Sequence, residues 1–401
     1  MKNILLLSTL YPSDDVRFLN NTAVCHYFAK EWQKLGYKVR VFFLYNTFPR
    51  YYYPLLKFLN KTIANKSGIA VLDKYLPYEH NYTIDDIKVT RLSVKKSRPG
   101  GSYKQDDIVK ISNRIIEILQ KEAFTPDIIL SHFLHPSIDV ISNLKKTYDV
   151  PTSVSLHGKE RVFSEETERN LNTVDYMGYR SYPIRNCFEK LYGEKEHFFC
   201  FSGVPSEYIV ERPREFSKKN LNFIYVGSLI KRKHPTCLIP AISNVFKEES
   251  YSITYVGDGA EKNSIVKVSE KNKCRDKVLF TGRINRDDVT KELDKADIFI
   301  MLSSDETFGL VYLEAMARGC IVIASTDEGM DGIIRNGENG FLCKAGDSIE
   351  LEKTLNLIKN LDANQLKKIS EAGLETARKM TDTRMAEEYI NFFIKKNNVK
   401  R

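Results

Sequence analysis

The cysteines of this sequence follow no organised spacing. There are seven of them, they are scattered, and no C-x-x-C pair occurs. This distribution is typical of buried free thiols in a reducing compartment, and it argues against a disulfide framework or a cysteine-rich zinc site. We therefore expect a protein without structural disulfides.

Long apolar runs are also missing. No stretch approaches the roughly 20 apolar residues of a membrane-spanning helix. The opening MKNILLLSTLYPS resembles a signal peptide, but its apolar core covers only Ile4 to Leu7 and no small-residue cleavage site follows. We interpret this run as the first buried strand. We expect a cytoplasmic protein, with or without peripheral attachment to the inner face of the cell membrane.

The chain is long, and its charge is unevenly distributed. Its 401 residues suffice for two domains, and its 42% apolar content is ordinary for a soluble protein. The net charge of +9 comes from residues 1–100, which hold 16 Lys and Arg against 7 Asp and Glu. This excess favours an anionic partner, and it leaves nucleic acid, an acidic membrane surface and a phosphorylated substrate open.

Apolar runs alternate with amphipathic segments throughout, which predicts βαβ units and parallel sheets. In the first half we expect two helices, over 20–35 and 105–122, and strands over 3–10, 37–44, 87–92, 127–133 and 152–157. The pattern restarts after Ser202, with expected strands over 221–226, 251–256, 277–281, 296–302, 320–324 and 340–343.

The expected fold is therefore α/β, with two Rossmann-like domains whose parallel sheets face a central cleft. The first domain should span residues 1–203 and the second 220–380, joined by a linker over 204–219. Residues 381–401 should form a helix that packs on the first domain. In such folds ligands bind at the carboxyl ends of the strands. No G-x-G-x-x-G follows the first strand, which disfavours a nicotinamide dehydrogenase.

Residues 296–346 are the most informative segment. Glu306 and Glu314 lie eight positions apart, on either side of a turn that follows an apolar run and opens a helical one. A helix start offers unpaired amides and the positive end of a dipole, which together suit a phosphate. An acid on each side could bind hydroxyl groups, so the segment suits a nucleotide-sugar.

The segment SSDETFGLVYLEAMARGC resembles the E-x7-E element of the retaining glycosyltransferases of family 4, which have the GT-B fold. VGSLIKRKH, YVGDGAE, LFTGRI and NGENGFL occur in that family's order. The resemblance is strong over 219–350 and looser over 1–200. It implies α-retaining transfer of a sugar from a nucleoside-diphosphate donor, UDP more than GDP. The acceptor would be a hydroxyl of a saccharide or lipid-linked molecule in bacterial polysaccharide or glycolipid synthesis.

The resemblance also assigns roles to the E-x7-E element. Glu306 would contact the sugar hydroxyls and Glu314 the ribose, while the phosphates would accept hydrogen bonds from the amides of Thr307, Phe308, Gly309 and Leu310. Two alternatives stay open: Glu306 as a solvated loop acid or helix cap, and Glu314 in an internal salt bridge. The segments that would line the cleft hold no D-x-D element, so no cofactor and no obligatory metal are expected.

The cationic side of the site departs from the family pattern. Lys233 matches the family's lysine, but Ser228 stands where an arginine is usual. Lys231, Arg232 and Arg283 are candidate replacements, although Lys231 and Arg232 could equally form a solvated basic loop. The resemblance further places Gly257 and Gly259 beside the nucleotide, and Gly282, Arg283 and Ile284 at the base.

In the first domain, the resemblance assigns His157 to the reacting sugar, so that His157, Glu306 and Lys233 form the expected catalytic group. His157 could also be a satisfied core histidine. His132 and His135 follow a predicted strand and are expected to line the same cleft. The family's early glycine pair is missing, and Arg17, Asn20 and Asn21 are candidates for acceptor contacts in its place.

Residues 45–67 interleave basic and aromatic side chains, and a second basic loop spans 95–104. The composition suits the surface of an anionic membrane, or else a mobile acceptor loop folded onto its own domain. Single-stranded nucleic acid, which such a surface could also bind, is disfavoured by the donor motifs. The remaining alternatives for the whole chain are a nucleotide-sugar epimerase and an inactive binding subunit of a partner transferase. The oligomeric state is left open.

Overall fold

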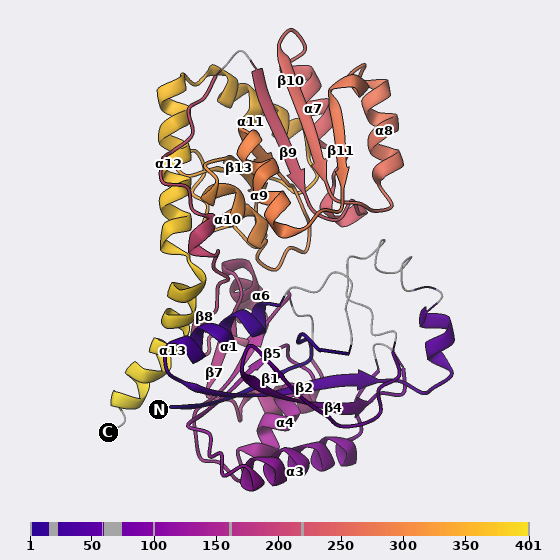
Figure 1. The fold of residues 1–401 in the computed structure, drawn as a ribbon, viewed down its shortest axis with the longest axis vertical. Helices are drawn as coiled ribbons and strands as arrows, with labels where there is room; N and C mark the ends of the chain where they lie inside the picture. The colour runs from indigo at the N-terminus through magenta and orange to yellow at the C-terminus, as the bar shows by residue number, and fades with distance from the viewer. Residues whose placement is uncertain are drawn as a thin grey trace.

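The computed structural model describes residues 2–15, 23–57, 59, 74–98, 101–159, 163–217 and 220–399. Two α/β units lie one above the other (Figure 1), each built on its own sheet. The eight-stranded sheet of the first unit has the order β3-β4-β2-β1-β5-β6-β7-β8, and the six-stranded sheet of the second has the order β11-β10-β9-β12-β13-β14. Two Rossmann-like units were the predicted architecture.

The first sheet holds β1 (Asn3–Ser8), β2 (Lys38–Thr47), β3 (His80–Ile84), β4 (Ile87–Lys95), β5 (Ile128–His132), β6 (Thr152–Leu156), β7 (Tyr176–Tyr179) and β8 (His197–Phe199). Its helices are α1 (Val24–Lys34), α3 (Gln105–Lys121), α4 (Ser137–Leu144), α5 (Glu165–Leu171) and α6 (Tyr182–Tyr192). The apolar run Ile4 to Leu7 is fully buried in β1, between β2 and β5, as predicted for a central strand.

One strand of the first sheet departs from the expected parallel arrangement. β3 runs antiparallel to β4, and the register pairs Ile84 with Ile87. The two residues between them, Asp85 and Asp86, have φ values of 47° and 61°. Left-handed conformations at both central positions make the two-residue turn that joins antiparallel strands. This hairpin is not predictable from the sequence, because neither aspartate is followed by the glycine that usually marks such a turn.

The second sheet is parallel throughout. Its strands are β9 (Asn220–Val226), β10 (Ser250–Val256), β11 (Val278–Gly282), β12 (Ile298–Ile300), β13 (Ile321–Ser325) and β14 (Phe341–Cys343). Its helices are α7 (Leu238–Val245), α8 (Lys262–Lys271), α9 (Arg286–Lys295), α10 (Leu310–Ala317), α11 (Ser348–Asn360) and α12 (Ala363–Lys379). Three short 3-10 helices are η1 (Ser206–Tyr208), η2 (Lys231–Lys233) and η3 (Arg275–Lys277).

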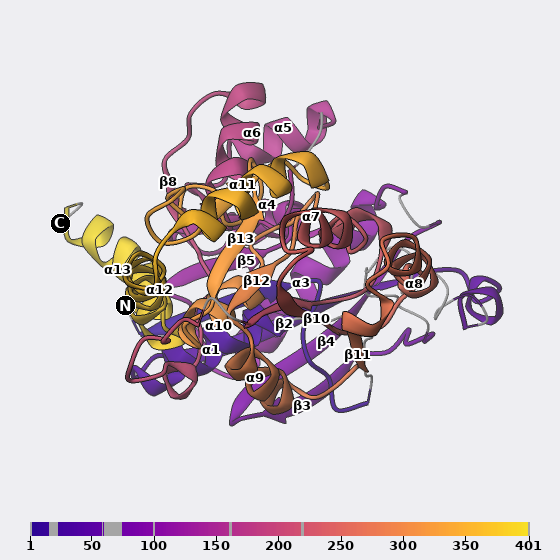
Figure 2. The same cartoon turned by 90° about the horizontal axis from the view of Figure 1, so that it is seen from above.

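The last helix, α13 (Asp382–Val399), returns to the first unit, as predicted. Figure 1 shows it beside α1, and in Figure 2 the preceding α12 is seen nearly end-on. The Trp32 indole of α1 donates to the carbonyl of Ala386 at 3.0 Å, and the Tyr389 ring packs edge-on against Phe28 and Trp32. Among the described residues, none of the helices combines the length and apolar character needed to cross a bilayer.

Candidate functional site at the domain junction

The loop after β12 carries the first acid of the E-x7-E element. Gly309, which precedes α10, has a φ of +81°, and a Cβ there would lie 2.3 Å from the Tyr312 ring. Only glycine fits this combination of backbone and packing. The helix begins at Leu310, the last residue of the turn that was predicted to open it. Glu306 therefore lies four residues before the helix, in a loop that turns back on itself.

Lys233 lies next to this loop. Its Nζ is 3.5 Å from Oε2 of Glu306, and the same carboxylate oxygen accepts a hydrogen bond from Ser303 Oγ at 3.2 Å. Lys233 belongs to η2, after β9, whereas Glu306 follows β12, and β9 and β12 are neighbours in the sheet. The lysine ammonium and the amide-rich entry to α10 thus lie on the same side of the second domain, as a diphosphate site requires.

Glu314 lies in α10 and is 7% exposed. Its Oε1 lies 2.7 Å from Nη2 of Arg286 and accepts from Arg286 Nε at 2.8 Å. The internal salt bridge left open by the sequence is therefore present. Arg286 also reaches the first domain, where its Nη1 donates to the Tyr27 hydroxyl at 3.3 Å.

The candidate replacements for the missing arginine differ in their surroundings. Arg232 donates to the carbonyls of Ser304 and Asp305, both at 3.3 Å, so it holds the loop in front of Glu306. Lys231 and Arg283 are exposed. Arg286, which the sequence analysis did not consider, is a further cation beside the E-x7-E element.

The three glycines that follow or end neighbouring strands meet at the carboxyl edge of the second sheet. The amide of Gly257 donates to the carbonyl of Gly282 at 2.9 Å, and a Cβ on Gly257 would lie 2.0 Å from the carbonyl oxygen of Gly227. A Cβ on Gly259 would lie 2.3 Å from the carbonyl oxygen of Leu229. These glycines let the turns of the expected nucleotide region pack backbone against backbone. Ser228 and Ile284 lie in the same turns, both partly exposed.

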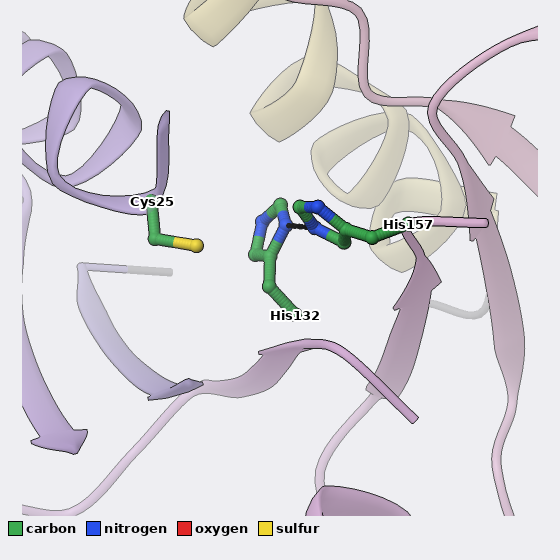
Figure 3. Close-up of side chains that lie close together, drawn as sticks. All are labelled: Cys25, His132 and His157. Atoms are coloured by element: carbon green, nitrogen blue, oxygen red, sulfur yellow. Dashed lines mark hydrogen bonds between the residues drawn. The ribbon is translucent and has the colours of Figure 1, made fainter. Parts of the chain in front are cut away.

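On the first domain, His157 follows β6 and His132 ends β5. Their rings are joined by a 2.8 Å hydrogen bond between His132 Nδ1 and His157 Nε2 (Figure 3), and Phe133 stacks on His157 at 4.0 Å. Burial lowers the pKa of His132 to about 3, and it also lowers the pKa of His157, with the His132 ring and the Arg180 guanidinium adding to the effect. Both rings are therefore neutral near pH 7. The carbonyl of His157 accepts from Thr307 Oγ1 at 2.7 Å, which links it to the loop of Glu306.

Cys25 points toward the same pair (Figure 3), and the three residues could in principle hold a metal, because their ligand atoms lie within 4.8 Å of one another. Arg180 weighs against this reading. It is 2% exposed, donates to the carbonyl of Cys200 and to Ser202 Oγ, and pairs with no carboxylate among the described residues. A second buried cation beside it would be costly. Arg180 follows β7, a short strand that the sequence analysis did not predict.

His135 does not join the His132–His157 pair. Its ring lies 3.4 Å from Asp139 Oδ2 in α4 and 3.3 Å from Thr167 Oγ1 in α5. The chain turns into α4 directly after this histidine and carries the ring toward those helices, so the expectation that it shares the site with His132 is not met. Arg17, Asn20 and Asn21 lie outside the described residues. A cavity of about 560 Å³ on another part of the junction, lined by residues of α12, α13 and neighbouring loops, contains none of the predicted site residues.

Comparison with known proteins agrees with this geometry. The family model described as Glycosyl transferases group 1 matches residues 209–376, which cover the second sheet and its helices. The match covers less than half of the 401 residues, and it shows that this stretch is similar to the group 1 family. The E-x7-E element, Lys233 and the glycine turns all lie within the matched residues.

Two curated relatives illustrate the match. N-acetyl-alpha-D-glucosaminyl L-malate synthase from Bacillus anthracis is 32% identical over 138 residues, which is 34% of this chain and 36% of that protein. The uncharacterized glycosyltransferase MJ1178 from Methanocaldococcus jannaschii is 26% identical over 350 residues, which is 83% of this chain and 93% of that protein. The alignment thus spans about a third of the first relative and nearly all of the second.

The fold extends over the whole chain. The crystal structure of Anabaena Alr3699/HepE in complex with UDP superposes with a TM-score of 0.69 at 17% identity, covering 99% of this chain and all of the other. The architecture is therefore GT-B, and the stretch that is similar to the group 1 family lies in its second half.

Proposed function

We propose that this glycosyltransferase moves a sugar from a UDP-sugar to a hydroxyl of a saccharide or lipid-linked acceptor, with retention at the anomeric carbon. The acceptor would be a growing bacterial polysaccharide or glycolipid. A lipopolysaccharide core biosynthesis glycosyltransferase from Rhizobium meliloti is a relative at 30% identity, and HepE is described with UDP and with UDP-glucose. Retention follows from the resemblance to family 4.

One observation carries the proposal. The Lys233 ammonium, the Glu306 carboxylate and the amides at the entry to α10 lie together, 3.5 Å separating the two charges. A diphosphate bound between the ammonium and the amides would leave its attached sugar next to Glu306. A loop amide that faces developing charge costs little reorganisation during reaction, so these groups would stabilise the departing diphosphate.

The expected bond changes involve donor and acceptor alone. The bond between the anomeric carbon and the diphosphate oxygen breaks, and a bond to the acceptor oxygen forms on the same face, while the acceptor proton leaves with the diphosphate. Neutral His157, which links to the donor loop through Thr307, would hydrogen-bond the sugar or the acceptor from the opposite domain. In this proposal the protein's own donors stabilise the leaving group, without a cofactor or an obligatory metal.

Donor binding is tested first by thermal shift. We expect UDP and UDP-sugars to raise the melting temperature, because a ligand that binds only the folded state stabilises it by mass action. The response should be lost in Lys233→Met. Product analysis with labelled UDP- and GDP-sugars then identifies the donor. Conversion of the donor without acceptor would indicate an epimerase, and binding without turnover an inactive subunit.

The catalytic role is tested by Glu306→Gln and Glu306→Ala. We expect each to lower kcat by about 100-fold or more, in line with the loss of a transition-state contact, while circular dichroism and the melting temperature of the free protein stay close to wild type. Full activity in either variant would refute the proposed site.

A further inference from the structure

A short segment of the first domain touches two loops of the glycosyltransferase domain. His157 and Lys159 follow β6, and the His157 carbonyl accepts from Thr307 Oγ1 at 2.7 Å. Lys159 Nζ donates to the carbonyl of Asp327 at 2.6 Å and pairs with Glu328 Oε1 at 3.0 Å. Thr307 comes after β12, whereas Asp327 and Glu328 come after β13. The segment therefore bridges the domains at two neighbouring loops.

Glu328 in turn holds the backbone of Glu306. Its Oε2 accepts from the Glu306 amide at 2.8 Å, and the amide of Gly329 donates to the Glu306 carbonyl at 3.0 Å. The contact is close, because a Cβ on Gly329 would lie 2.5 Å from the Cα of Phe308. The amide and the carbonyl of Glu306 are thus both held by the loop that carries Glu328.

The charges of this network balance across the junction. Glu306 is paired with Lys233 of its own domain, and Glu328 with Lys159 of the other. The Glu328 side chain is 12% exposed and that of Lys159 is 30% exposed. A largely buried carboxylate that lost its cation would be costly to keep charged beside a second carboxylate. Glu328 therefore holds Glu306 best when the first domain supplies Lys159.

We propose that Lys159 is a positioning residue: through Glu328, it makes the placement of Glu306 depend on contact between the two domains. The proposal rests on the proposed function, in which Glu306 binds the transferred sugar. UDP alone would be bound by Lys233 and the α10 amides, which do not depend on the Lys159–Glu328 pair. The sugar of the donor would be bound well only when Lys159 meets Glu328.

This difference between nucleotide and nucleotide-sugar provides the test. In Lys159→Met and Glu328→Gln we expect kcat/KM for the donor sugar to fall about tenfold, while the Kd for UDP, measured by calorimetry, changes less than twofold. Gln keeps an oxygen for the Glu306 amide and loses only the charge. The double variant should be no more than about twofold worse than either single variant, since both changes remove one interaction. Lys159→Arg should recover most of the activity.

A matched control uses an exposed lysine pair that makes no contact with Glu306 or Glu328. Lys291 pairs with Asp288 on the exposed face of α9 at 2.7 Å, and Lys291→Met should behave as wild type in both measurements. Three results would each overturn the proposal. They are a wild-type kcat/KM in Lys159→Met, a fall in kcat/KM of the double variant equal to the product of the two single falls, or a loss of UDP affinity as large as the fall in kcat/KM.

Failure of the proposed function is distinguishable. If the wild-type protein turns over no donor, the Lys159–Glu328 interaction can still be tested by urea unfolding, which requires no activity. The four proteins compared are the wild type, Lys159→Met, Glu328→Gln and the double variant. Non-additive changes in the unfolding midpoint support the Lys159–Glu328 interaction, whereas additive changes overturn it. Lys159 is partly exposed, so its variants are expected to fold even if Glu328→Gln is unstable.

Discussion

Single side chains of the site are held by partners that are distant in the sequence. Glu306 meets Lys233, Glu314 meets Arg286, and His132 meets His157. Each pair joins two segments that follow different strands or helices. Apart from Arg286, these residues were expected from the sequence and the resemblance, but the pairing requires the sheet order.

The two histidines make a prediction about pH. Their folded pKa values lie below the ordinary value near 6.5, mainly because of burial. As the pH falls below about 6.5, these histidines become protonated in the unfolded chain but stay neutral in the folded protein. The free energy of unfolding should therefore decrease over that range. Their contribution is fully present above the unfolded pKa.

The measurement is urea unfolding between pH 7.5 and 4.5. We expect His132→Gln to show a shallower loss of stability with falling pH than the wild type, whatever its stability at pH 7.5. An unchanged slope would mean that the pair does not titrate as described.

At the scale of the elements, the turns after the strands of the second sheet are closely packed. Gly257 has a φ of +137°, and its Cα faces the carbonyl of Gly227. We expect Gly257→Ala to lower the free energy of unfolding by about 2–4 kcal/mol, because it combines an unfavourable backbone conformation with a backbone clash. Thermal and urea unfolding would measure this loss. Gly337, with open space around its Cα, is the matched control, and its alanine variant should show only the smaller cost of a positive φ.

The turn after β9 makes a prediction about donor affinity. Ser228 stands where the family has an arginine, and Lys233 is the cation that lies near Gly227 in the same turn. We expect Ser228→Arg to tighten UDP binding by about tenfold, since a charge-assisted hydrogen bond contributes about 1.5–3 kcal/mol before any cost of ordering the side chain. Calorimetry would show it. Ser228→Gln controls for size without charge, and equal affinity in both variants would contradict an electrostatic origin.

Strongly patterned elements were predicted well from the sequence, whereas some of the short strands were missed. The prediction of a helix over 105–122 agrees with α3, and the parallel strands of the second sheet all lie within about two residues of their predicted bounds. β7 and β8, which have four and three residues, were not predicted. Runs this short carry no period, and neighbouring strands rather than local preference make them extended.

At the scale of the whole molecule, α13 returns to the first domain, and an acidic residue is buried where this helix begins. Asp382 is the first residue of α13. Burial raises its pKa to about 6; the Arg286 charge opposes this rise, and Glu31, Glu207 and Glu314 add to it. An acid whose folded pKa exceeds its unfolded value loses its stabilising contribution as the pH rises from about 4 to 6, and that contribution stays lost above pH 6.

We therefore expect Asp382→Asn to be more stable than the wild type at pH 7.5, by at most ~2 kcal/mol, because one pKa unit corresponds to about 1.4 kcal/mol and part of the site reaches solvent. At pH 4 the two proteins should be alike. Unfolding midpoints at both pH values would test this. A variant that is equally destabilised at pH 4 and pH 7.5 would show that Asp382 contributes hydrogen bonds rather than charge.

The sequence by itself determined that the chain alternates strands and helices over two halves, and which short motifs suit a nucleotide-sugar, because periodicity and turn chemistry are local properties. Only the tertiary structure decided which charges face each other. Lys159 and Glu328 are 169 residues apart and belong to different domains, yet they form one ion pair that supports Glu306. Contacts of this kind depend on how two separately built sheets meet, and no local pattern encodes that.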